Sequence, residues 1–241
     1  MKMNSHRINL FIFALLMIFA LLIFLQTSGY GQITTSDTAF QPRLCGILYV
    51  PGPKTDGSPF YNDEWMNSDI LLSNGEMVTN KPLKYNAYID EVIWFCQEKS
   101  VQIQLEKHFI DGFYLKQFQG KTVCFKRIHV PASLTGDTLE FFAEALYEGR
   151  MSLYAKRQVV VGGTVTQTKE AASYIYDKLV VKPRYYLVLP NHKVVMLKQI
   201  SRRTVLKALP LSYRNIAKEI LNTHHLRLHT ENDLVDLLTR M

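Results

Sequence analysis

Short strand-like runs follow one another from Ser68 to Val130 with only a few residues between them, and this spacing limits the folds open to the chain. Connections of this length join antiparallel neighbours, because a parallel pair needs a crossover of a dozen or more residues. We therefore predict an antiparallel meander in the first half, with strands over residues 69–72, 76–80, 83–89, 91–97, 101–105, 112–118 and 122–130.

Two local patterns support this meander. Asn74-Gly75 separates the first two runs, and both residues tolerate the positive φ that a type I′ hairpin turn requires. The run at 101–105 alternates apolar and polar residues, which indicates a strand with one buried face and one solvent-exposed face. An earlier run at 44–50 is predicted to form a further strand, and a turn-rich stretch follows it over 51–59.

The second half is predicted to extend the sheet. Residues 139–147 fit either a short helix or a strand, residues 151–161 fit a long strand, and residues 164–170 fit a loop. A last hairpin is predicted from two runs at 185–189 and 193–200, because turn-forming residues separate them.

Three short amphipathic helices are predicted after this hairpin. Ser201 is a good N-cap for the first helix, Pro210 ends it, and Ser212 can cap the second. Thr230 and Asp233 form a capping-box pattern for the third. Helices this short depend on packing for their stability, so we expect them to dock on the sheet.

Together these patterns predict an α+β protein. An antiparallel β meander, either a twisted sheet or an incomplete barrel, is expected over residues 44–200, with the short C-terminal helices of 201–241 packed on one face or end of it. The composition agrees, because 47% hydrophobic and 20% charged residues argue against a disordered chain. The 12% aromatic content suits half-buried strands.

The first 31 residues have the layout of a secretory signal peptide. A basic start precedes residues 10–25, which carry no polar side chain, and small and polar residues follow. We expect cleavage near Gly31-Gln32, a linker over 32–43, and export to the periplasm or the cell surface. An uncleaved anchor in contact with the membrane is the alternative, because spanning a bilayer takes about 20 apolar residues.

The positive charge of the chain is spread out. The formal charge is +7, and removing the two charges of Lys2 and Arg7 leaves +5. A nucleic-acid-binding protein concentrates its charge on one face, whereas here the basic residues are scattered apart from Arg202, Arg203 and Lys207. No nucleic-acid partner is therefore predicted, and a weak attraction to anionic lipid or polysaccharide fits better.

Three cysteines, Cys45, Cys96 and Cys124, allow at most one internal disulfide. Cys96 and Cys124 both lie in predicted strands, so a bridge between neighbouring strands is one alternative. The other alternative is that the cysteines are buried as apolar side chains. An exported protein meets an oxidising compartment, which permits a disulfide without requiring it, so both alternatives stay open.

Several segments share an outline with a known group of proteins. They are Trp65, DILL at 69–72, NG at 74–75, PLKYNAY at 82–88, LKALP at 206–210, LRL at 226–228 and ENDL at 231–234. This outline resembles uncharacterised exported β-rich proteins of the Bacteroidota, in which such a hairpin opens a β-domain. The resemblance implies no activity, cofactor or catalytic residue. The triplets at 37–39 and 137–139 also resemble Asp-Ser/Thr-apolar acceptors for O-glycosylation in that phylum.

Three histidines near the C-terminus are the nearest approach to a metal-binding cluster. On a continuous helix His225 and His229 would share a face, as metal-binding pairs do. Residues 226–228 are predicted to link two helices, which would spoil that spacing. We therefore expect His224, His225 and His229 to be solvated residues at helix ends, and we predict no metal site.

No pattern in the chain identifies a catalytic site. Glu140, Glu144 and Glu148 are spaced by four and would align on one helix face, but glycosidases hold two carboxylates about 5–10 Å apart across a cleft. The row is therefore interpreted as a solvated face. The chain lacks a Gly-x-Ser-x-Gly motif, and Gly162-Gly163 is not followed by the lysine of a phosphate loop. The catalytic residues are thus unknown, and no cofactor is predicted.

Aromatic residues cluster in and just before the predicted strands. They are Phe60, Tyr61, Trp65, Tyr85, Tyr88, Trp94 and Phe95. Rings that project from a sheet can stack on sugars or grip a peptide. The alternative, which the sequence favours, is that these rings fill the core or cover a sheet edge.

The leading functional prediction is an exported, non-enzymatic cell-envelope protein that acts as a binding or interaction module for a protein, lipid or glycan. One alternative is a carrier, in which a curled sheet encloses a small apolar ligand. The other is an exported hydrolase whose site is assembled from distant strands. An apolar cavity would favour the carrier, and converging polar groups with shifted pKa values would favour the hydrolase. A free sheet edge would favour the interaction module.

Overall fold

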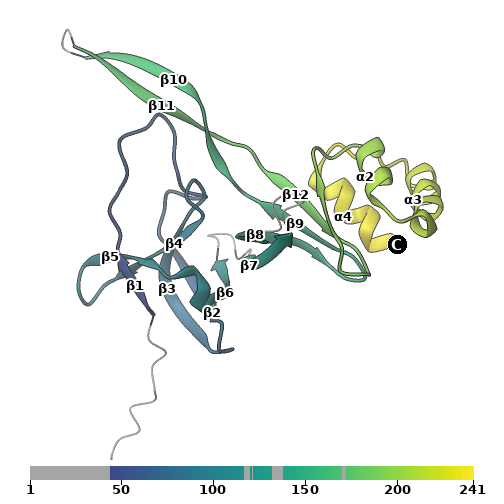
Figure 1. Cartoon of the computed structure of the whole chain (residues 1–241), viewed down its shortest axis with the longest axis horizontal. Helices are drawn as coiled ribbons and strands as arrows, with labels where there is room; N and C mark the ends of the chain where they lie inside the picture. The colour runs from purple at the N-terminus through teal and green to yellow at the C-terminus, as the bar shows by residue number, and fades with distance from the viewer. Residues whose placement is uncertain (1–43, 117–119, 121, 132–137, 170–171) are drawn as a thin grey trace, which may run out of the picture. The chain divides into compact units, whose positions relative to one another are not determined.

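The computed structural model describes residues 44–116, 120, 122–131, 138–169 and 172–241 (Figure 1). The predicted signal peptide, its cleavage site near Gly31-Gln32, the linker over 32–43 and the triplet at 37–39 lie outside these residues. Among the described residues, no helix combines the length and the apolar character that a membrane crossing requires.

Eleven strands of the described chain form one antiparallel sheet. They are β1 (Gly46–Leu48), β2 (Met66–Leu72), β3 (Met77–Asn86), β4 (Glu91–Cys96), β5 (Val101–Leu105), β6 (Ile110–Lys116), β7 (Thr122–Pro131), β8 (Thr138–Glu148), β9 (Ser152–Lys156), β12 (Arg184–Val188) and β13 (Val194–Leu197). Their order in the sheet is β1-β5-β4-β3-β2-β6-β7-β8-β9-β12-β13. Strands β10 (Val159–Lys169) and β11 (Ala172–Val181) pair with each other as a separate hairpin. The predicted fold class is confirmed.

The connection between β5 and β6 shows that the sheet curls. Strands β2 to β5 form a meander, but β6 pairs with β2 rather than with β5, which corrects the predicted order. In a flat sheet the four strand steps from β5 to β6 would cover about 19 Å. The link between the two strands consists only of Glu106 and the short 3-10 helix η1 (Lys107–Phe109). A 3-10 helix rises only about 2 Å per residue, so this link is too short for the flat-sheet distance. The sheet therefore bends β5 toward β6 without closing.

The hairpin predicted at Asn74-Gly75 is confirmed, but its turn is not of type I′. Only Gly75 of this pair has a positive φ, at +86°. The Gly75 N–H donates to the Leu72 carbonyl at 2.9 Å, and the Leu72 N–H donates to the Glu76 carbonyl at 2.9 Å. This pattern is a type I turn followed by a one-residue bulge, which places the glycine in the left-handed region.

The last hairpin, between β12 and β13, repeats this turn with a histidine in the glycine position. The His192 N–H donates to the Leu189 carbonyl at 2.9 Å, and the Leu189 N–H donates to the Lys193 carbonyl at 2.9 Å. His192 has φ +61°, a conformation that costs a residue with a Cβ about 1–2 kcal/mol.

We expect His192→Gly to raise the free energy of unfolding by about 0.5 kcal/mol, because relief of the left-handed strain exceeds the entropy that glycine adds to the unfolded chain. The matched change in the other hairpin, Gly75→Ala, should lower it by about 1 kcal/mol. A Cβ at Gly75 would meet nothing within 4 Å, so no steric clash contributes to this loss. Urea unfolding measures both, and two changes of the same sign would contradict the expectation.

Two strand predictions need correction, and one open alternative is decided. The runs at 76–80 and 83–89 form the single strand β3, which passes through an irregularity where Asn80 has φ +55°. Residues 139–147, which fitted a helix or a strand, lie in strand β8. The long strand predicted over 151–161 is two strands, because the chain leaves the main sheet between β9 and β10.

The loop predicted over 164–170 is also wrong for residues 164–169, which belong to β10. Their backbone groups pair with β11, from Thr164↔Asp177 to Lys169↔Ala172. Gly162 is the unpaired residue of a bulge in β10, where a Cβ would lie 2.7 Å from the Val180 side chain. The two glycines therefore bend the strand instead of ending it.

Four aromatic rings pack in the interior of the curled sheet: Tyr85, Phe113, Phe125 and Phe142. Phe113 and Phe125 stack with their centroids 4.8 Å apart, and Tyr85 lies 5.0 Å from Phe125. The Tyr85 hydroxyl donates to the buried Asp90 carboxylate at 2.7 Å. Burial and this carboxylate raise the pKa of Tyr85 well above its usual value.

The C-terminal helices are α2 (Arg202–Ala208), α3 (Leu211–Thr223) and α4 (Glu231–Arg240). The Ser201 cap of α2 and the Thr230–Asp233 capping box of α4 are confirmed. Ser212 does not cap α3, because the Pro210 carbonyl already accepts the first helical hydrogen bonds, from Tyr213 and Arg214. Apolar residues of the three helices share a second core with β9, β12 and β13.

Candidate functional site

The two faces of β3 carry different side chains. Leu83 and Tyr85 point into the core, so Lys84 and Asn86 point to the opposite side, which we call the outer face. The chain before β3 follows the same alternation. Phe60 lies opposite Asn86 in an antiparallel β-bridge, and Trp65 precedes Met66, whose side chain is buried on the core side. A loop that runs from Tyr49 to Trp65 therefore places several rings over the outer face.

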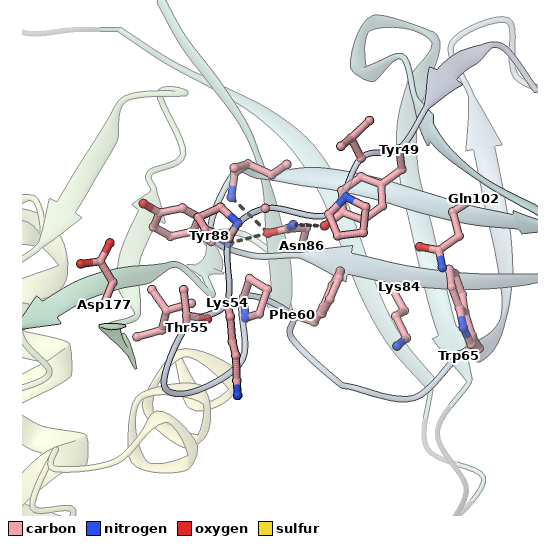
Figure 2. Close-up of a pocket in the computed structure, with 17 residues that line it drawn as sticks. Tyr49, Lys54, Thr55, Phe60, Trp65, Lys84, Asn86, Tyr88, Gln102 and Asp177 are labelled. Atoms are coloured by element: carbon pink, nitrogen blue, oxygen red, sulfur yellow. Dashed lines mark hydrogen bonds between the residues drawn. The ribbon is translucent and has the colours of Figure 1, made fainter. Parts of the chain in front are cut away.

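A pocket of about 630 Å³ lies between this loop, the outer face and β11 (Figure 2). We call it the outer-face pocket. Its lining residues are Tyr49, Val50, Pro51, Gly52, Pro53, Lys54, Thr55, Pro59, Phe60, Trp65, Lys84, Asn86, Tyr88, Ile89, Gln102, Asp177 and Leu179. Rings, prolines and aliphatic groups form most of this wall, with a few amides and charges between them.

Backbone hydrogen bonds attach the loop to β11. The Asp56 N–H donates to the Asp177 carbonyl at 2.8 Å, and the Leu179 N–H donates to the Asp56 carbonyl at 2.7 Å. The next residue, Gly57, has φ +98°, and a Cβ there would lie 2.8 Å from the Leu179 carbonyl oxygen. Only glycine allows this close approach, so the wall of the pocket depends on it.

Asn86 organises the floor of the pocket. Its side-chain oxygen accepts hydrogen bonds from the backbone N–H groups of Tyr88 at 3.2 Å and Ile89 at 3.3 Å. Its amide nitrogen donates to the Tyr49 hydroxyl at 3.3 Å. Asn86 is only 3% exposed, so this side chain holds a turn and a ring in place from beneath.

Lys84 lies between two rings of the pocket, as Figure 2 shows. Its ammonium is 5.1 Å from the centroid of Phe60 and 5.0 Å from that of Trp65. The Trp65 ring also packs against Phe95, with centroids 5.5 Å apart. Within the part of the chain that the structure describes, the ammonium makes no ion pair and no hydrogen bond.

The aromatic residues singled out from the sequence divide into two groups. Phe60, Trp65 and Tyr88 line the outer-face pocket, and Tyr88 is 47% exposed. The others are packed: Tyr85 is buried in the core, Tyr61 and Trp94 lie against it, and Phe95 contacts Trp65. The packing interpretation therefore holds for the second group, whereas the rings of the first group lie at the pocket.

The three glutamates spaced by four lie on strand β8 and not on a helix. Glu140 pairs with Arg127 at 2.9 Å, and Glu148 pairs with Lys126 at 2.6 Å. A bulge between Ala145 and Tyr147 shifts the register with β9, so Glu148 points to the face opposite Glu140 and Glu144. The three carboxylates serve separate ion pairs.

Glu144 belongs to a partly buried ion-pair network that joins the sheet to α4. It accepts a short hydrogen bond from Arg157, between β9 and β10. The Arg157 guanidinium also binds both carboxylate oxygens of Glu231, at 2.5 and 2.9 Å. The Tyr185 hydroxyl on β12 donates to Glu231 at 2.7 Å. The network is structural, since its four groups satisfy one another.

The network makes stability depend on pH in alkaline solution. Burial and the hydrogen bond to Glu231 raise the pKa of Tyr185 to about 12, compared with about 10 in an unfolded chain. This contribution to stability is therefore complete below pH 10 and is lost as the pH rises from 10 to 12. We expect the unfolding free energy of the natural protein to fall relative to Tyr185→Phe across that window. A constant difference would contradict the assignment.

The histidines near the C-terminus are exposed and lie between helices, as predicted: His224 follows α3, and His225 and His229 lie before α4. Among the described residues, no group of three or more His, Cys, Asp or Glu is placed to hold a metal ion. Arg202, Arg203 and Lys207 are exposed on α2.

The cysteines are far apart in the sheet. Cys96 on β4 is buried and donates to the Glu98 carboxylate at 3.2 Å, whereas Cys124 lies half-buried on β7. Strands β4 and β7 are not neighbours, so the bridge between adjacent strands is ruled out for this pair. Cys45 is exposed, next to β1, so burial holds for Cys96 and only in part for Cys124.

No family model matches the chain, and no curated protein and no solved structure matches it either.

Proposed function

We propose that this protein is an exported, non-enzymatic binding module of the bacterial cell envelope, and that the outer-face pocket holds its ligand. The observation that carries the proposal is the pocket itself. Its volume of about 630 Å³ lies within the range of about 300–1,000 Å³ typical of small-molecule sites, and its wall of rings and a few polar groups is typical of them. The apolar run over residues 10–25 supports export.

The arrangement of titratable groups favours binding over hydrolysis. The lining of the pocket contains one carboxylate, Asp177, and neither a histidine nor a cysteine. Glycoside hydrolysis uses a pair of carboxylates, and the lining of the pocket supplies one. The carrier alternative places the ligand inside the curled sheet, where the rings of Phe113, Phe125 and Phe142 already pack against one another.

Fluorescence of Trp65 tests the binding proposal. The chain has two tryptophans, and Trp94 does not line the pocket, so Trp94→Phe leaves Trp65 as the single reporter. We expect its emission to change saturably with one member of a panel of acidic, neutral and cationic trisaccharides and short peptides. If no member of the panel changes the Trp65 emission and none gives a heat of binding in calorimetry, a binding function at this pocket is contradicted.

Export is tested separately. Mass spectrometry of the N-terminus of the protein recovered from the envelope fraction should find a chain that begins near Gln32. Recovery from the cytoplasm alone would contradict the location, and recovery from the envelope with Met1 retained would favour the uncleaved anchor.

A further inference from the structure

We infer that the outer-face pocket takes an acidic sugar, a pyranose carrying a carboxylate, and that Lys84 binds the negative charge. This inference rests on the proposed binding function and specifies the chemistry of the ligand. It is carried by the position of the Lys84 ammonium within the pocket and by the other polar groups around it.

Lys84 is held ready for an anion. Its ammonium lies against the faces of Phe60 and Trp65, and the electron-rich faces of the rings stabilise a cation there. Rings offer no hydrogen-bond acceptor comparable to a carboxylate, so the three N–H donors of the ammonium stay available. Since no described residue accepts from them, a carboxylate entering the pocket would form the first charge-assisted hydrogen bond.

The other charges of the pocket also favour an anionic ligand. Lys54 is the second ammonium of the wall, and it lies 5.3 Å from the centroid of the Tyr176 ring. Asp177 is the one carboxylate among the lining residues, so the wall has a net positive charge. A cationic ligand would meet two like charges, and Lys84 already occupies the ring faces that such a ligand would use.

The polar groups of the pocket favour a sugar over a peptide. Peptides that bind to sheets gain affinity by pairing with a free strand edge. Beneath the pocket, β3, β4 and β5 each lie between two paired neighbours, so their backbone groups are already used. What remains are side chains: the Tyr88 ring, the exposed amide of Gln102 and the two ammonium groups. Such a set suits the hydroxyls and flat faces of a pyranose.

The test compares ligands that differ in charge or in chemical class. Isothermal titration calorimetry with the full-length protein would use trigalacturonate, its methyl ester, the cationic trisaccharide of chitosan and triglutamate. We expect trigalacturonate to bind about 10-fold or more tightly than its methyl ester, and its affinity to fall with added salt. Lys84→Met, which keeps the aliphatic stem, should remove this preference by lowering the affinity for trigalacturonate to about that for the ester.

Lys81→Met is the matched control, because Lys81 on the same strand lies over Trp94, outside the pocket, at 5.9 Å. It should leave all affinities unchanged. Equal binding of the acid and the ester, or a preference for the acid that persists in Lys84→Met, would overturn the inference. The proposed binding function would still stand. Tighter binding of triglutamate would overturn the sugar class. Failure of every ligand in this panel would overturn the inference, and the Trp65 fluorescence panel would then decide separately whether the pocket binds any ligand.

Discussion

Replacing Arg157 by alanine is expected to lower the free energy of unfolding by about 3 kcal/mol, because removal of one partner leaves the buried Glu144 carboxylate without compensation. Glu144 is only 7% exposed, and it would then lie near Glu231 with no cation between them. Urea unfolding measures the loss.

Arg240→Ala is the matched control for this experiment. Arg240 pairs with Asp236 one helical turn away, with both side chains well exposed, and such pairs contribute less than about 0.5 kcal/mol. If Arg157→Ala and Arg240→Ala cost the same, the ion-pair network does not hold α4 on the sheet.

Phe125→Ala is expected to lower the free energy of unfolding by about 3–5 kcal/mol. Phe125 is fully buried and contacts three other rings: Tyr61 at 5.2 Å, Tyr85 at 5.0 Å and Phe113 at 4.8 Å between centroids. Truncation would leave a cavity that neighbouring strands cannot fill, since the sheet fixes their backbones. Thermal or urea unfolding, followed by far-UV circular dichroism, measures the loss.

Two further changes separate the cavity from the loss of a ring. Phe125→Leu should cost less than half as much, because most of the buried volume remains. Phe109→Ala removes a ring that is 44% exposed, and it should change stability by no more than about 0.5 kcal/mol. A small effect of Phe125→Ala would mean that the interior of the curled sheet is loosely packed.

Local signals predicted the fold class and most elements. The alternation over 101–105, the Asn74-Gly75 turn and the Thr230–Asp233 capping box each depend on residues close in sequence. Such signals are set by backbone conformation and short-range hydrogen bonds. The pairing of β6 with β2 could not be predicted in the same way, because it follows from the curl of the sheet.

The hairpin β10–β11 was missed because its sequence has two conflicting signals. Gly162-Gly163 is typical of a turn, and the following Thr164–Lys169 run is polar. Threonine is β-branched and suits a strand whose faces are both open to water, but without a buried face there is no hydrophobic alternation to reveal it. The spacing of Glu140 and Glu144 was ambiguous for a related reason: residues four apart share a face in a strand as well as in a helix.

The candidate site was visible only in part. Aromatic clustering pointed to Phe60, Trp65 and Tyr88, and alternation with buried Leu83 and Tyr85 would have placed Lys84 beside them. Tyr49 and Asp177 lie far from these residues in sequence and reach the pocket only through the folded loop and β11. A single sequence contains no local signal for such an assembly.

The hairpin β10–β11 joins the core at one end only, through Val159 and Leu179, while Ile175 is 74% exposed. A two-stranded ribbon of this kind is marginally stable by itself. Its pairs can therefore fray one after another, with an opening free energy that increases toward the core. Asp177 lies at the boundary, where Asp56 adds its hydrogen bonds to β11. Fraying of the outer ribbon would thus stop short of the pocket and leave its wall intact.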